Sequence, residues 1–177
     1  MQLSVKDGPW NPGSRTESLV DTMWGQRNRF GDQVIDHVER VAAAVPPDTR
    51  ATALLHDLLE LCPTARWQLR RPDLTRTELE ALELLRHVAG EPYEVYVRRT
   101  ADAPGPAGRL ARIVKLADLE DHLAHPSIPA DAPPYAWARE QLLTARERSV
   151  DAAPGTPAQT RRPGVPRSAV ALSPPSS

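Results

Sequence analysis

The strongest chemical signal in the sequence is a histidine followed directly by an aspartate. His56 and Asp57 lie in the segment LLHDLLE, where the flanking leucines predict a buried helix. A histidine and a carboxylate in apolar surroundings are costly unless they are paired or bind a metal ion. Adjacent helical side chains point about 100° apart, so an ion that contacts both lies beside the helix and takes further ligands from elsewhere.

Two residues in other segments can supply those ligands. His37 lies in IDHVERVA on the preceding predicted helix, and Asp118 lies in VKLADLEDH on a long later one. Two imidazoles and two carboxylates suit a borderline divalent cation such as Mn²⁺, Fe²⁺ or Zn²⁺. Taken singly, each histidine is more often a hydrogen-bonded core residue, and Asp118 can simply pair with Lys115. The order H…HD…D on successive helices favours a joint metal site.

The same segments resemble the motifs of the HD superfamily of metal-dependent phosphohydrolases. The nearest resemblance is to the alarmone hydrolase domain of the RelA/SpoT type, including its small stand-alone forms, over roughly residues 20–125. That family has the motifs H-x-x-x-V-A, A-L-L-H-D-x-x-E-D and K-L-A-D-x-x-x-N. The counterparts here are HVERVA from His37, ALLHDLLEL from Ala53 and KLADLEDH from Lys115, preceded by QRNRFG from Gln26.

The resemblance implies one divalent metal, Mn²⁺ before Fe²⁺ or Zn²⁺, held by His37, His56, Asp57 and Asp118. Such a metal activates a water molecule and polarises a phosphoryl oxygen. The implied substrate is a small phosphorylated nucleotide, with guanosine tetraphosphate as the first candidate. Asp57 and Glu60 are the expected catalytic residues. Glu60 lies one turn past His56 and can position or deprotonate the water; the alternative is a solvated residue near a helix end.

Three basic residues are candidates for binding the substrate phosphates. Arg27 and Arg29 can each hold a phosphate through paired hydrogen bonds, or they can be surface charges. Lys115 lies one turn before Asp118, so it can orient that carboxylate or meet a phosphate.

Two positions differ from the family pattern. Leu61 stands in place of the second acidic residue after the HD pair, and His122 stands in place of the Asn. His122 can still donate a hydrogen bond or reach a metal. These differences favour a rival function, a degenerate module of this type that binds a nucleotide or a protein without turnover. A third hypothesis is a structural helical bundle with an incidental HD pair, which predicts no bound metal.

The elements that position these residues are predicted to be helical almost throughout. Apolar residues at helical spacing predict an all-α, non-repetitive HD-type bundle over residues 15–150. Asp48 is expected to cap the helix that carries the HD pair, and Thr75 and Glu78 form a capping box for a later helix. The expected helices are 15–26, 32–46, 48–62, 64–70, 76–90, 91–100, 107–124 and 134–149.

The two ends and the composition complete these expectations. Residues 1–14 are expected to be an irregular lead-in, and 151–177, rich in Pro, Ser and Ala, a disordered tail. The net charge of −1 gives no evidence for a nucleic-acid partner. No apolar run is long enough for a membrane span, and the single Cys62 is compatible with a reducing compartment, so we expect a cytoplasmic protein. The oligomeric state is left open.

The remaining histidines and tyrosines belong to no pattern that indicates chemistry. His87 and His125 are interpreted as structural or surface residues, like Cys62. Tyr93 and Tyr96 can stack on a base or ribose, but their helical spacing favours packing in the core.

Overall fold

The structure of the chain, a computed structural model, describes residues 15–69, 74–126 and 128–151. Within these ranges the chain is helical and contains no strand, only an isolated antiparallel bridge between Arg27 and Gln33. The all-α prediction is therefore confirmed. The lead-in predicted for 1–14 and the tail predicted after Asp151 lie outside the described residues. Along the described chain no helix combines the length and the apolar character that crossing a bilayer requires.

The helices follow one another with short connections. Their bounds are α1 Arg15–Asp21, α2 Val34–Ala44, the 3₁₀ turn η2 Pro47–Thr49, α3 Arg50–Leu55, α4 Leu58–Leu61, the 3₁₀ turn η3 Pro63–Ala65, α5 Arg66–Leu69, α6 Arg76–Leu85, α7 Tyr93–Asp102, α8 Gly105–Ala124 and α9 Tyr135–Asp151.

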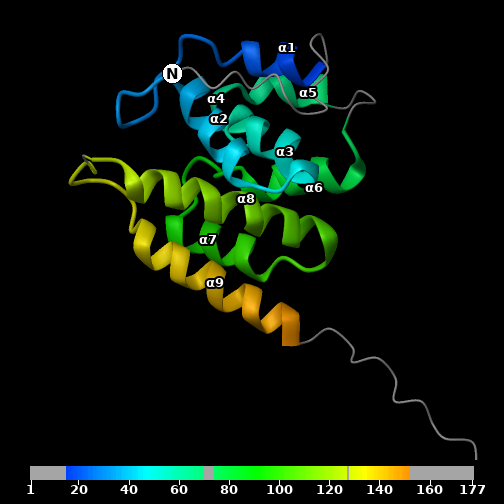
Figure 1. The fold of residues 1–177 in the computed structure, drawn as a ribbon, viewed down its shortest axis with the longest axis vertical. Coiled ribbons are helices and arrows are strands. Elements are labelled where there is room, and N and C mark those ends of the chain that lie inside the picture. The colour runs from blue at the N-terminus through cyan, green and yellow to red at the C-terminus, as the bar shows by residue number, and fades with distance from the viewer. Residues whose placement is uncertain (1–14, 70–73, 127, 152–177) are drawn as a thin grey trace, which may run out of the picture.

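The long helix α8 is the centre of the packing. It lies between α2 and α6 on one side and α7 and α9 on the other (Figure 1), and it contacts all of them. Ala111, Val114 and Ala117 face the larger apolar cluster, which is built mainly from α2, α3 and α6. Leu116 and Leu119 face a second cluster built with α7 and α9. Residues of α8 between these two faces, including Asp118, are therefore buried at the junction of the two halves.

The helix predicted over 48–62 is divided in two. It breaks at the HD pair, since α3 ends at Leu55 and α4 begins at Leu58, with Asp57 at ψ −11° between them. The expected cap at Asp48 is wrong, because Asp48 lies inside the 3₁₀ turn η2. The residue before α3 is Thr49, whose hydroxyl donates to the carbonyl of Pro46 at 2.8 Å and so does not cap the helix.

Two other helices end earlier than predicted. The first, α1, stops at Asp21, and the chain then turns through Gly25, whose φ of 79° lies in the left-handed region that favours glycine. The later one, α6, has the predicted capping box at its start but ends at Leu85. There the side chain of Arg99 donates to the carbonyls of Leu84 and Arg86 at 3.2 and 3.0 Å. These bonds satisfy carbonyls that a continuing helix would have used.

Candidate metal centre

The structure brings together four residues that the sequence places far apart: His37, His56, Asp57 and Asp118, called the His/Asp cluster below. His37 comes from α2, the HD pair from the α3–α4 junction, and Asp118 from the middle of α8. His37, His56 and Asp118 are 1%, 4% and 1% exposed, whereas the side chain of Asp57 is 28% exposed. The cluster is therefore closed on the core side and opens to solvent beside Asp57.

The ligand atoms of the cluster converge. His37 Nε2 lies 3.2 Å from Asp118 Oδ1 and 3.7 Å from Asp57 Oδ2. His56 Nε2 lies 3.6 Å from Asp118 Oδ1 and 3.3 Å from Asp57 Oδ1. Two atoms bound about 2.1 Å from one ion, at angles of roughly 90–110°, lie about 3.0–3.4 Å apart. The spacing is close to that of neighbouring ligands on a single divalent cation.

Several of these atoms are buried with no hydrogen-bond partner among the described residues. They are His37 Nε2, His56 Nε2, Asp118 Oδ1 and, one turn further along α8, His122 Nδ1. A buried polar atom without a partner costs roughly 1–3 kcal/mol, and most folded proteins avoid it. A cation between these atoms would give them the partner that they lack among the described residues. The histidine and aspartate groups of this cluster can thus hold a metal ion.

The other nitrogen of each cluster histidine is held by the protein. His37 Nδ1 lies 2.8 Å from Asp121 Oδ2, and His56 Nδ1 lies 2.7 Å from the carbonyl of Ala53. Both partners accept a hydrogen bond, so both histidines carry a proton on Nδ1. Their Nε2 atoms are directed into the cluster, which is the arrangement common among metal-binding histidines.

Asp121 and Arg40 are functional candidates that the sequence reasoning missed. The Arg40 guanidinium donates to both Asp121 oxygens at 2.6 and 2.9 Å and reaches Asp32 at 3.2 Å. Asp121 is therefore fixed between Arg40 and His37. The sequence does contain a signal for both residues. Asp121 lies three residues after Asp118, and Arg40 lies three residues after His37, so each is on the same helix face as a predicted ligand.

Lys115 orients one end of the Asp118 carboxylate. Its ammonium lies 2.7 Å from Asp118 Oδ2, leaving Oδ1 to face the histidines. Lys115 is 9% exposed, and its ammonium lies 5.1 Å from the ring centre of Tyr96. The sequence predicts two roles for Lys115, orienting Asp118 or binding a phosphate. Its contact with Asp118 fits the first role, and that carboxylate already matches its charge.

The carboxylates make the cluster strongly negative. Burial lowers the pKa of His37, but the nearby Asp118 carboxylate, the hydrogen bond to Asp121 and the charge of Asp57 outweigh it and raise this pKa to about 10. Burial also opposes charge on His56, yet Asp57 and Asp118 raise its pKa as well. Burial would raise the pKa of Asp118, but Lys115 and the neighbouring histidines hold it well below its usual value. The protein groups around the cluster therefore favour a positive charge there, either a proton on a histidine or a cation.

Glu60 lies at the solvent side of the cluster. The side chain of Glu60 is exposed to solvent on one side. Desolvation on its other side and the negative charge of Asp57 raise the pKa of its carboxyl, while the charges of Lys115 and His87 oppose this shift. These charges place Glu60 within electrostatic reach of the cluster. A carboxylate with a raised pKa is better able to accept and return a proton near neutral pH.

The two predicted arginines differ in position. Arg27 is exposed, and its guanidinium donates to the carbonyl of Gly31 within its own turn, so no contact of it reaches the cluster. Arg29 is also exposed, but it lies near Tyr135. Burial raises the pKa of the Tyr135 hydroxyl, and the positive charge of Arg29 is close enough to offset part of this rise. Tyr135 stacks on His122 at 4.8 Å, so Arg29 borders the cluster.

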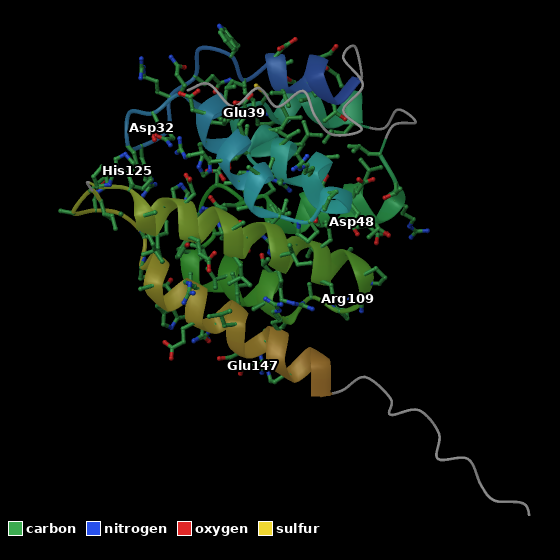
Figure 2. The ribbon with its side chains drawn as sticks, in the orientation of Figure 1. Asp32, Glu39, Asp48, Arg109, His125 and Glu147 are labelled. Atoms are coloured by element: carbon green, nitrogen blue, oxygen red, sulfur yellow. The ribbon has the colours of Figure 1, made fainter. Side chains whose placement is uncertain are left out.

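The two tyrosines of α7 also differ. Tyr96 is buried in the core, as predicted, with its hydroxyl donating to Leu85 O at 2.6 Å. The hydroxyl of Tyr93 is buried without a hydrogen-bond partner among the described residues. His125 directly follows α8, and its Nε2 lies 3.7 Å from an oxygen of Asp32; both side chains are labelled in Figure 2.

A cavity of about 550 Å³ lies elsewhere, and no cluster residue lines it. Its wall consists of leucines from α4, α5 and α6 and of small residues around the start of α8, with Glu80 and Glu83 as its charged groups. An apolar cavity with two carboxylates is a poor receptor for a phosphate. Comparison with protein-family models and with curated proteins finds no match for this chain. The residues and contacts described above are the basis for assigning a function.

Proposed function

We propose that the chain is a metal-dependent phosphohydrolase of the HD type that acts on a small phosphorylated nucleotide, with a guanosine alarmone as first candidate. One observation carries the proposal: Nε2 of His37, Nε2 of His56 and Oδ1 of Asp118 are buried without a hydrogen-bond partner among the described residues, and they converge beside Asp57. His37, His56, Asp57 and Asp118 hold the metal. When bound, a divalent ion lowers the pKa of a water and stabilises charge that develops on a phosphoryl oxygen.

The metal we propose is a first-row divalent ion. Two imidazoles and two carboxylates accept Mn²⁺, Fe²⁺ or Zn²⁺, and this donor set alone does not separate them. The Asp57 and Asp118 carboxylates offset only part of the double charge of the ion, because Lys115 is already paired with Asp118. Substrate phosphate can then approach the site without meeting excess negative charge.

Asp57 and Glu60 define the side from which water and substrate arrive. Asp57 is the partly exposed member of the cluster, and the exposed Glu60, three residues further along the chain, has a pKa that burial and the charge of Asp57 raise. Glu60 takes the proton of the attacking water at a carboxylate oxygen, and the carboxylate of Asp57 faces the metal as a ligand. A positioned general base of this kind contributes roughly 10²–10⁴-fold to the rate.

Groups around this opening can bind the rest of a nucleotide. Arg29 supplies a positive charge next to the stacked rings of Tyr135 and His122. The unpartnered Tyr93 hydroxyl offers a hydrogen-bond donor within electrostatic range of Asp118. Lys115 acts on the substrate indirectly, because it holds Asp118 in place. Arg27 is the weaker candidate of the two arginines, since its contacts stay within its own turn.

A binding module without turnover is the second candidate, and Leu61 favours it. Leu61 stands where the resembled family has an acidic residue, and it packs against the large apolar cluster. No second carboxylate is therefore supplied to the opening from that position. In this reading the metal and the surrounding groups bind a nucleotide, and Glu60 has no proton to move.

Turnover on a nucleotide panel separates the two candidates. Protein loaded with Mn²⁺, Fe²⁺ or Zn²⁺ is expected to release phosphate or pyrophosphate from at least one guanosine or related nucleotide, and Asp57→Asn should abolish this. Glu60→Gln should keep the metal and lose turnover by roughly a hundredfold or more. The matched control is Glu39→Gln, an exposed carboxylate on α2 (Figure 2), which should leave the rate unchanged. Metal and nucleotide binding with no product across the panel would favour the second candidate.

A further inference from the structure

His122 lies within the ligand atoms of the His/Asp cluster although it is not one of the four predicted ligands. It is on α8, one turn after Asp118, and its Nδ1 lies 3.1 Å from Asp118 Oδ1. This nitrogen is buried and has no hydrogen-bond partner among the described residues. The 3.1 Å approach is therefore not explained by a well-formed hydrogen bond between the two side chains.

Two sets of potential metal ligands share one histidine. His37, His56 and Asp57 form one set, and His37, Asp118 and His122 form the other. His37 Nδ1 is bonded to Asp121, so Nε2 is the nitrogen of His37 that remains for a metal. One imidazole lone pair binds one ion. The two sets consequently describe one ion with a larger ligand shell and not two neighbouring ions.

We propose that His122 is a fifth ligand of this ion, which gives a centre of three imidazoles and two carboxylates. The inference rests on the proposed metal site and deepens it. A nitrogen-richer shell favours ions later in the first row, so the site should prefer Fe²⁺, Co²⁺ or Zn²⁺ over Mn²⁺ and Mg²⁺.

The surroundings of His122 support a ligand role. Its ring is stacked between His37 and Tyr135, with ring centres 4.8 Å apart in each case. This packing holds the ring beside Asp118 and leaves its buried Nδ1 without a hydrogen-bond partner among the described residues. The rings of His37 and His122 are 18° from parallel, so directing both lone pairs at one ion takes a rotation about the His122 χ2 torsion, which has a broad energy well.

The rival role for His122 is to position Asp118 by a hydrogen bond, and His122→Asn separates the two. An asparagine amide can still donate to Asp118 but is a poor ligand for Zn²⁺ or Co²⁺. The matched control is His125→Asn, three residues further along the chain just after α8 (Figure 2), since His125 belongs to neither set of potential ligands. His122→Asp is the second variant, because it restores a ligand and removes the donor. Circular dichroism and thermal melting of each chelated variant check that it folds.

Two measurements on the full chain test the inference. X-ray absorption of the Co²⁺- or Zn²⁺-loaded protein should count three imidazoles, and two in His122→Asn. Chelator competition should show Zn²⁺ affinity falling by about a hundredfold in His122→Asn, recovering partly in His122→Asp and staying unchanged in His125→Asn. Two imidazoles in the unsubstituted protein, with equal affinity in His122→Asn, would overturn the role of His122 and leave the four-residue site standing. Absence of any bound metal would overturn both.

Discussion

Binding of the metal should release protons from the cluster histidines. Asp118 and Asp121 raise the pKa of His37 to about 10, and Asp57 and Asp118 raise that of His56, in each case against the effect of burial. Both Nδ1 atoms already donate to Asp121 or Ala53, so the extra proton is on Nε2, the atom that faces the metal. The ion and the proton therefore compete for the same lone pair.

The size of this competition follows from the pKa of His37. At pH 7.5 a group with a pKa of about 10 is protonated by roughly two orders of magnitude, so displacing its proton costs about 3 kcal/mol of metal affinity. That cost falls by about 1.4 kcal/mol for each unit of pH, which is a tenfold gain in affinity for each proton displaced. His56 adds a second proton to the extent that it is charged. We expect between one and two protons released per ion at pH 7.5.

Calorimetric titration of the chelated protein with Zn²⁺ or Mn²⁺ measures this release. The titration is repeated at one pH in buffers with different ionisation enthalpies, and the slope of observed enthalpy against buffer enthalpy gives the number of protons. A slope of one or more, with affinity rising at least tenfold from pH 6.5 to 7.5, agrees with the expectation. Tight binding with a slope near zero would show that His37 is neutral and that the carboxylates do not act on it as described.

Three further outcomes follow from the same contacts. Asp121→Asn should weaken metal binding by roughly 10–100-fold, because Asp121 orients His37. The control is Glu120→Gln, a neighbouring residue paired with Arg139 on the surface, which should not change the affinity. Equal affinities of the two variants in chelator competition would contradict the role of Asp121. Chelated protein should lose stability as pH rises from about 6.5 toward 10, because the folded pKa of His37 lies above its unfolded value, and metal should reduce this slope in thermal melts. Thr75→Ala should cost about 1 kcal/mol in denaturant unfolding and leave metal affinity unchanged.

Features set by neighbouring residues could be predicted from the sequence. The capping box of Thr75 and Glu78 depends on residues three apart, and it is present as predicted. The apolar spacing predicts helices at about the right places, because burial of one face is the main force behind each of them. The pattern H…HD…D also predicts which four side chains approach each other, since each motif specifies one helix face.

Features that depend on contacts between distant segments could not be predicted. The early end of α6 depends on Arg99, whose hydrogen bonds to Leu84 and Arg86 reach across from α7. The break at the HD pair is not indicated by the local sequence, which has leucines on both sides of the pair. The link from Arg40 through Asp121 to His37 joins α2 to α8 and is visible only when the two helices are side by side.

The metal content of the purified chain tests the account most directly. Protein prepared without chelator, with Mn²⁺, Fe²⁺ or Zn²⁺ supplied during expression, should carry about one equivalent of a divalent transition metal by elemental analysis. His56→Ala should lose it, because this change removes one of the converging Nε2 atoms from a buried position. Less than about a tenth of an equivalent in the unsubstituted protein, or the same content in His56→Ala, would contradict the assignment of the His/Asp cluster as a metal centre.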